Sequence, residues 1–134
     1  MSSKVLLISQ EYPPTIGGAG SVAMNNRHQL LETGLDVSLI TSNNKKYWMM
    51  NMVFDIWSNL IVSRTNKISL IINDLGSILI CGLFLPKSKL EKSVMYLHGS
   101  EFEIINTKSK GWLRTILLKY SIIRVIKHSK NIIC

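Results

Sequence analysis

The chain has 134 residues, of which 46% are hydrophobic and 18% are charged, and its formal net charge is +8. Its length suits one domain with a hydrophobic core, and its apolar content excludes an intrinsically disordered protein. Every uninterrupted apolar run is far shorter than the roughly 18 residues that a membrane-spanning helix needs, and two cysteines exclude a disulfide framework.

Short apolar runs rich in Val, Leu and Ile alternate with longer stretches along the first half of the chain. Such runs are typical of strands buried on both faces of a parallel sheet. In chain order, the pattern predicts a strand over residues 4–9, a Gly- and Pro-rich loop over 10–20, a helix over 21–33 that ends at Gly34, a strand over 35–41, a helix over 48–64 and a strand over 68–73.

Large apolar residues recur at helical spacing in the helix predicted over 48–64. A stripe of Met and aromatic side chains is far more often a core face than a cofactor site. We therefore expect the following set to pack against the sheet: Met50, Val53, Trp57, Leu60 and Ile61.

The second half of the chain continues the alternation of strands and helices. It predicts a short apolar helix over 76–85, a basic loop over 86–92, a strand over 94–97, a helix over 112–127 and a strand over 131–134. Strands that alternate with helices indicate an α/β protein with a doubly wound, Rossmann-like parallel sheet and right-handed crossovers. The last apolar run is not followed by a helix, so we expect residues 1–134 to form a partial domain.

The loop after the first strand contains Gly18-x-Gly20-x-x-Ala23, which formally matches the dinucleotide fingerprint. Glycines in such a motif let the backbone approach phosphates beside a helix N-terminus. Residues 11–16 separate the motif from the strand, however, and the second strand ends without an acid, which argues against NAD. Lys45 and Lys46 leave an NADP site open, and a simple Gly-rich turn is an equal alternative.

The quartet His98-Gly99-Ser100-Glu101 directly follows the strand predicted over 94–97. In open α/β sheets, ligands bind at the carboxyl ends of the strands, so an imidazole and a carboxylate are delivered where a ligand would lie. The loop over 10–20 and the residues Asp74 and Gly76 reach the same edge. We expect these three loops to converge on one crevice, with a purely structural His98 as the alternative.

Basic residues concentrate in the second half of the chain. Residues 1–84 contain six Lys or Arg against five acids, whereas residues 85–134 contain ten against three. This asymmetry indicates either an anionic partner or a solvated basic face. The segment 108–130 has the composition for peripheral contact with an anionic bilayer, but its apolar residues surround the helix, which favours a buried helix with charges at its rim. No nucleic-acid-binding motif occurs, so nucleic acid is not an expected partner.

The chain resembles the N-terminal, acceptor-side domain of family 4 glycosyltransferases of GT-B fold. The resemblance rests on the first strand with Tyr12-Pro13-Pro14 and Gly17-Gly18, on Asn73-Asp74-Leu75-Gly76 and above all on His98-Gly99-Ser100-Glu101. It implies a two-domain enzyme that transfers a sugar from a nucleotide-sugar to an acceptor hydroxyl in glycan or glycolipid assembly.

This resemblance also implies the ligands and the roles of individual residues. The ligands are a nucleotide-sugar donor and a glycan or lipid-linked acceptor, with no metal or other cofactor, in the cytoplasm or at the inner face of the membrane. His98 is the implied catalytic residue, at the reaction centre. The implied substrate-binding residues are Gly17, Gly18, Asp74, Gly99 and Glu101.

The donor-binding C-terminal domain of that family has no counterpart in residues 1–134, so we expect this chain alone to be inactive. Two alternatives remain open. One is a non-catalytic fragment, or a subunit that pairs with a separate donor-binding chain. The other is an NADP-binding oxidoreductase domain.

Overall fold

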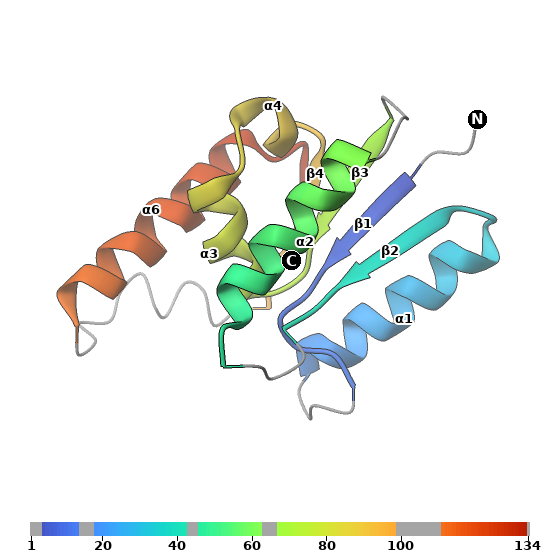
Figure 1. Ribbon diagram of the computed structural model, residues 1–134, viewed down its shortest axis with the longest axis horizontal. Helices are drawn as coiled ribbons and strands as arrows, with labels where there is room; N and C mark the ends of the chain where they lie inside the picture. Colours follow the sequence, from blue (N-terminus) through green and yellow to red (C-terminus); the bar gives the residue numbers. More distant parts are fainter. Residues whose placement is uncertain (1–3, 14–17, 43–45, 63–66, 99–110, 134) are drawn as a thin grey trace.

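The computed structural model describes residues 4–13, 18–42, 46–62, 67–98 and 111–133, and it contains a five-stranded, all-parallel sheet flanked by helices (Figure 1). The protein is therefore α/β, with the doubly wound, Rossmann-like arrangement that the sequence predicts. The strand order is β2-β1-β3-β4-β5. The strands are β1 (Lys4–Ile8), β2 (Asp36–Ile40), β3 (Ile68–Ile72), β4 (Ser93–Tyr96) and β5 (Asn131–Ile133).

The helices lie on both sides of the sheet. The connection from β1 to β2 and the connection from β2 to β3 run in opposite directions along the sheet, and right-handed crossovers then place their helices on opposite faces. Figure 1 accordingly shows β1 and β2 between α1 and α2, and α2, α3 and α6 pack side by side. The helices are α1 (Gly18–Glu32), α2 (Trp48–Val62), α3 (Leu75–Phe84), α4 (Lys87–Leu90) and α6 (Trp112–His128).

The hydrophobic core lies between the sheet and the layer formed by α2, α3 and α6. Fully buried Leu6 and Leu70 on neighbouring strands face this layer, and Met52, Ile78 and Ile122 come from its three helices. Helices α3 and α6 approach closely at Gly82, where a Cβ atom would lie 2.6 Å from Cα of Ser121. The absence of a side chain at Gly82 therefore sets the spacing of these two helices.

Two predictions about local structure are wrong. The basic loop expected over 86–92 contains the short helix α4, because Pro86 provides its N-cap and the Glu91 amide bonds back to the Lys87 carbonyl. In α2, Met50 and Ile61 are 72% and 76% exposed, although we expected them in the core. The buried residues are Met52 and Ile56, with Val53, Trp57 and Leu60 packed beside them as expected.

The expectation that α6 is buried on all sides is also wrong. One face of the helix packs on α3 and the sheet through buried residues that include Leu118, Ile122 and Val125. The opposite face is exposed, because α6 is the outermost helix of its layer and no described element covers it. None of the helices within the described ranges is both long enough and apolar enough to cross a membrane.

Candidate functional site

The strand order creates a topological switch point between β1 and β3. From β1 the chain crosses to β2 on one side, and from β2 it crosses back over β1 to β3 on the other side. The loops that leave the carboxyl ends of β1 and β3 therefore diverge, which opens a crevice at that edge of the sheet. In open α/β sheets, ligands bind outside the carboxyl ends of strands at such a point.

A cavity of about 280 Å³ occupies this crevice. Its polar lining comes from three strand ends and one helix: Gln10 and Glu11 follow β1, Asp74 follows β3, His98 follows β4 and Arg114 lies on α6. Its apolar lining includes Trp48 of α2, Leu75 and Leu79 of α3 and Leu118 of α6. The predicted convergence of the β1, β3 and β4 loops is therefore confirmed for the residues that the structure describes.

Asp74 organises the floor of the crevice. It is the N-cap of α3, and its Oδ1 accepts hydrogen bonds from the amide and the hydroxyl of Ser77 at 3.0 and 2.7 Å. Its Oδ2 accepts a hydrogen bond from the Glu11 amide at 2.8 Å. The Ser77 hydroxyl in turn accepts the Gln10 amide at 3.1 Å. The start of α3 is thus bonded to the chain that leaves β1.

Ser9 and Asn73, both fully buried, extend this hydrogen-bond network beneath the crevice. The Ser9 hydroxyl lies 2.5 Å from the Glu11 carbonyl and 3.1 Å from Oδ2 of Asp74, and its single proton serves one acceptor at a time. Asn73 donates from Nδ2 to Ser9 Oγ at 3.1 Å and to the Ala19 carbonyl at 2.8 Å. Asn73 therefore ties the first turn of α1 to the ends of β1 and β3.

His98 is held at the rim of the crevice by the main chain. Its Nε2 lies 2.6 Å from the carbonyl oxygen of Asn73. A carbonyl oxygen only accepts, so Nε2 carries the hydrogen in this contact. The residue is exposed and lines the cavity, so its imidazole meets both the β3 end and any ligand there. With the ring hydrogen on Nε2, Nδ1 can accept a hydrogen bond from a sugar hydroxyl.

Gly76 makes room for Gln10. A Cβ atom at Gly76 would overlap the amide group of the Gln10 side chain, so any larger residue displaces Gln10. Both residues line the cavity. The glycine in the Asp74-Leu75-Gly76 turn therefore brings a side-chain amide from the β1 loop against the N-terminus of α3.

The predicted site residues are only partly brought together. His98 and Asp74 line the same cavity, and Gly18 is the first residue of α1, next to the lining residue Ala19. Gly17, Gly99 and Glu101 lie outside the described residues. Sequence reasoning missed Gln10, Ser77 and Arg114. The three-residue spacing of Asp74 and Ser77 is typical of an N-cap and the third residue of a helix, so it could have indicated this contact. No sequence pattern indicates the position of Arg114.

The glycine motif after β1 does not form a dinucleotide-type turn in the structure. Gly18 and Gly20 both lie inside the first turn of α1, and nine residues separate β1 from this helix. A Cβ atom at Gly20 would lie 3.3 Å from the Tyr12 amide nitrogen, so this glycine permits close packing of the loop on the helix. At the end of β2, Ser42 is buried and donates to the Gln10 carbonyl at 2.9 Å.

The described part of the chain contains neither a cluster of metal ligands nor an accessible thiol. No group of three or more His, Cys, Asp or Glu residues there is arranged to hold a metal ion. Cys81 is fully buried in α3, and burial, with a smaller contribution from the charge of Asp74, raises its thiol pKa far above the ordinary range. This thiol is therefore a core side chain that stays protonated at neutral pH.

Comparison with known proteins identifies no relative of this chain. No family model matches it, and no curated protein and no solved structure matches it either.

Proposed function

We propose that the chain is the acceptor-side, N-terminal half of a GT-B glycosyltransferase. In the complete enzyme, a sugar would pass from a nucleotide-sugar to an acceptor hydroxyl of a glycan or a lipid-linked glycan. The observation that carries the proposal is the position of His98. This residue, from the motif that most resembles family 4 glycosyltransferases, lines the cavity at the switch point beside Asp74.

The chemistry of the crevice supports a small polar ligand. Together, the residues Gln10, Glu11 and His98 supply both hydrogen-bond donors and hydrogen-bond acceptors. Arg114 adds a guanidinium, the group best suited to a phosphate. Trp48 and the leucines supply the apolar surface that small-molecule sites combine with a few polar groups. A sugar ring, with hydroxyls at its edge and C–H groups on its faces, fits this mixture.

The size of the cavity favours one sugar-sized group over a dinucleotide. Its volume of about 280 Å³ lies at the lower end of the range for small-molecule sites. The position of Gly18 and Gly20 within α1 removes the Gly-rich turn that a dinucleotide site would need directly after β1. The NADP-binding alternative is accordingly the weaker one.

In this proposal, the residues divide into ligand contacts and supports. His98 contacts the transferred sugar, while Gly17, Gly18, Gly99 and Glu101 contribute further backbone and side-chain contacts. Asp74 acts mainly by positioning, because its carboxylate oxygens already accept bonds from Ser77 and Glu11. The donor nucleotide would be held chiefly by a second Rossmann-like domain, on the same chain or on a partner chain.

The proposal is tested by titrating the ¹⁵N-labelled chain and following its amide resonances. The ligands are a panel of nucleotide-sugars, simple glycosides and NADPH. We expect a nucleotide-sugar or a glycoside to shift the amides of Gln10, Gly76 and His98, which line the cavity. The amides of α4, which lies at the opposite edge of the sheet, serve as the internal control (Figure 1).

Two results would contradict the proposal. One is saturable binding of NADPH with shifts centred on Gly18, Gly20 and Ala23, which would favour an oxidoreductase domain. The other is a panel in which no sugar-containing ligand shifts the cavity amides at millimolar concentration. Turnover of a nucleotide-sugar by this chain alone would leave the reaction class intact and would show that no second domain is needed.

A further inference from the structure

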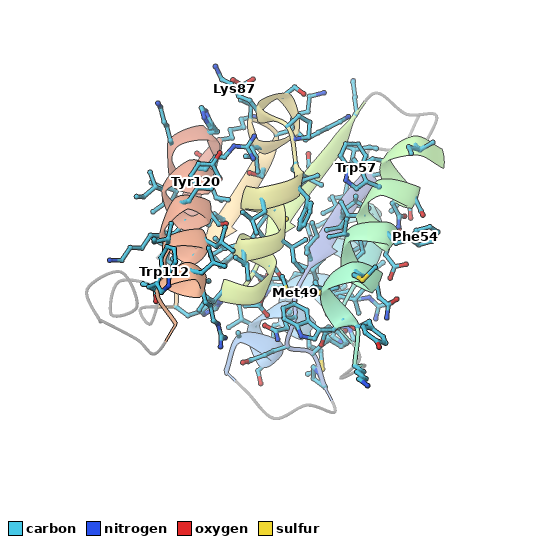
Figure 2. All side chains as sticks on the ribbon, turned by 60° about the vertical axis from the view of Figure 1, so that its left-hand side comes forward. Met49, Phe54, Trp57, Lys87, Trp112 and Tyr120 are labelled. Atoms are coloured by element: carbon cyan, nitrogen blue, oxygen red, sulfur yellow. The ribbon has the colours of Figure 1, made fainter. Side chains whose placement is uncertain are left out.

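The exposed face of α6 is apolar along most of its length. Trp112, Leu113, Ile116, Tyr120 and Ile123 recur at helical spacing on the side opposite the buried residues, and each is more than half exposed, with Trp112 at 75%. Figure 2 shows Trp112 and Tyr120 on α6, at the outer end of the α6, α3 and α2 layer. Surfaces of this kind on soluble domains mark interaction sites, because burial of these side chains is favourable.

Cations flank this apolar face, and no acid interrupts it. Helix α6 carries Lys119, Arg124 and Lys127 near these apolar residues, whereas Arg114 lines the crevice. The residues from Trp112 to His128 include no Asp or Glu. Arg124 donates to the carbonyls of Gly82 and Leu85 at 2.8 and 2.6 Å, so its charge is fixed beside the helix. The cations of this face are complementary to an anionic surface, and its apolar side chains are complementary to an apolar interior beneath that surface.

Helix α2 provides an internal contrast. It also exposes large apolar side chains, among them Met50 and Phe54 at 72% each, and it lines an apolar groove with Phe84. The residues from Trp48 to Val62 include no Lys or Arg, however, and they include Asp55. Exposed apolar area is therefore common to α2 and α6, whereas of these two helices α6 alone carries Lys or Arg among its own residues.

We propose that the outer face of α6 docks this domain on an anionic lipid bilayer. The helix would lie in the plane of the membrane interface, with Trp112, Ile116 and Tyr120 below the headgroups and Lys119 and Lys127 among the lipid phosphates. Its 17 residues rise about 25 Å along the axis. This inference does not depend on the proposed transferase activity.

A second copy of the chain fits this face less well than a membrane. A symmetric dimer through α6 would place one cationic helix against another, without an acid on either helix to compensate. An anionic bilayer would neutralise these cations. The charge of the face therefore selects the lipid surface.

The test measures binding of the full chain to vesicles by co-sedimentation. Vesicles of equal parts phosphatidylglycerol and phosphatidylcholine are compared with vesicles of phosphatidylcholine alone. We expect binding to the anionic vesicles and a partition coefficient at least tenfold lower for the neutral ones. Acyl chains carrying bromine should quench tryptophan emission in the bound protein, and Trp112→Phe should remove most of this quenching, because Trp48 and Trp57 lie on α2.

Matched variants separate charge from apolar contact. On α6, Lys119→Gln and Lys127→Gln should each lower the partition coefficient into anionic vesicles about fivefold. The control Lys67→Gln, at the start of β3, should change it less than twofold. Trp112→Ala should lower it about tenfold, and the exposed aromatic control Phe54→Ala on α2 should not. All five positions are exposed or half-exposed, so these variants should retain the circular dichroism of the parent.

Three outcomes would overturn the proposal. The first is equal partition into anionic and neutral vesicles, or none into either. The second is a concentration-dependent dimer in which Trp112 is shielded and vesicles do not bind, which would assign α6 to a second copy. The third is strong protection of Trp112 from acrylamide quenching in the dilute monomer, which would show that another segment of this chain covers the face.

Discussion

Nε2 of His98 lies 2.6 Å from the carbonyl oxygen of Asn73, so a residue that follows β4 is anchored to the main chain at the end of β3. The anchor is a backbone atom, and the side chain of Asn73 is engaged elsewhere, with Ser9 and Ala19. Substitutions of the Asn73 side chain that preserve the fold should therefore leave the imidazole in place. This contact fixes the direction from which His98 can meet a ligand.

Replacing His98 by Ala should weaken the binding of any sugar ligand about three- to tenfold, because one hydrogen bond in the crevice is lost. The fold should lose about 1 kcal/mol of stability or less, because the residue is exposed and its bond to the Asn73 carbonyl is only partly buried. The measurement is a ligand titration followed by amide resonances, with His128→Ala at the end of α6 as the control. Unchanged affinity in His98→Ala would remove His98 from the site.

Replacing Asp74 by Ala should destabilise the protein by about 2–4 kcal/mol. The change removes the N-cap of α3 and leaves the partly buried amide of Glu11 and the buried hydroxyl of Ser77 without their acceptor. Urea unfolding gives the free energy directly. Asp74→Asn keeps one oxygen as an acceptor, but its NH₂ group would face a hydrogen-bond donor on the other side. Its loss of stability should therefore be smaller than that of Asp74→Ala.

Asp55→Ala is the matched control for Asp74, because Asp55 is an exposed carboxylate on α2. Its free energy of unfolding should stay within about 0.5 kcal/mol of the parent. If Asp74→Ala were no more destabilising than Asp55→Ala, the hydrogen bonds to Ser77 and Glu11 would have no part in holding β1 against α3.

Replacing Gly82 by Ala should separate α3 from α6. The added Cβ would lie 2.6 Å from both Cα and Cβ of Ser121, so one helix must shift, at a cost of about 1–3 kcal/mol. At Gly18 an added Cβ meets nothing within 4 Å, so Gly18→Ala should not destabilise the fold. The urea midpoints of the two variants test this, and equal midpoints would contradict the close packing of α3 on α6.

Cys81 should make stability fall in alkaline solution. Its pKa is raised in the folded state, so above the ordinary thiol pKa of about 8.5 the unfolded chain loses a proton that the folded chain keeps. The contribution of Cys81 to the free energy of unfolding is fully present below that pH. Above it, the free energy of unfolding falls by about 1.4 kcal/mol per pH unit.

Cys81→Ala should have a flatter dependence of the unfolding free energy on pH between about 9 and 10, although its stability at neutral pH is lower. A thiol reagent supplies a second readout on a Cys134→Ser background: Cys81 should react at neutral pH only when denaturant is added. Rapid labelling of the folded protein would show that the thiol is accessible, contrary to its complete burial.

The sheet could be predicted well because its strands are dictated locally. Residues 5–8 are a continuous run of Val, Leu and Ile, and Ile68–Ile72 is interrupted only by the exposed Ser69, because these strands are buried on one or both faces. The helices were harder. Apolar residues occupy most positions of both α2 and α6, so hydrophobic spacing does not define which side faces the sheet. Met50 and Ile61 were misassigned for this reason.

The candidate site was predictable only where motifs mark it. His98 and Asp74 follow strands, and the carboxyl ends of parallel strands meet at one edge, so their convergence follows from the fold class. Ser77, Gln10 and Arg114 take part through contacts between residues far apart in the sequence. The Gln10 amide, for example, bonds to a hydroxyl 67 residues away, and no local pattern carries that information.

The hydrogen bonds from the Glu11 and Gln10 amides to Asp74 and Ser77 span 63 and 67 residues, so no isolated segment of the chain can form the floor of the crevice. Exchange of these amides with solvent should therefore require that β1 and α3 separate. A ligand held above them would bind the folded chain alone and would raise its stability by mass action. Occupancy of the crevice and resistance to proteolysis would then rise and fall together, which couples the lifetime of this protein to the supply of its ligand.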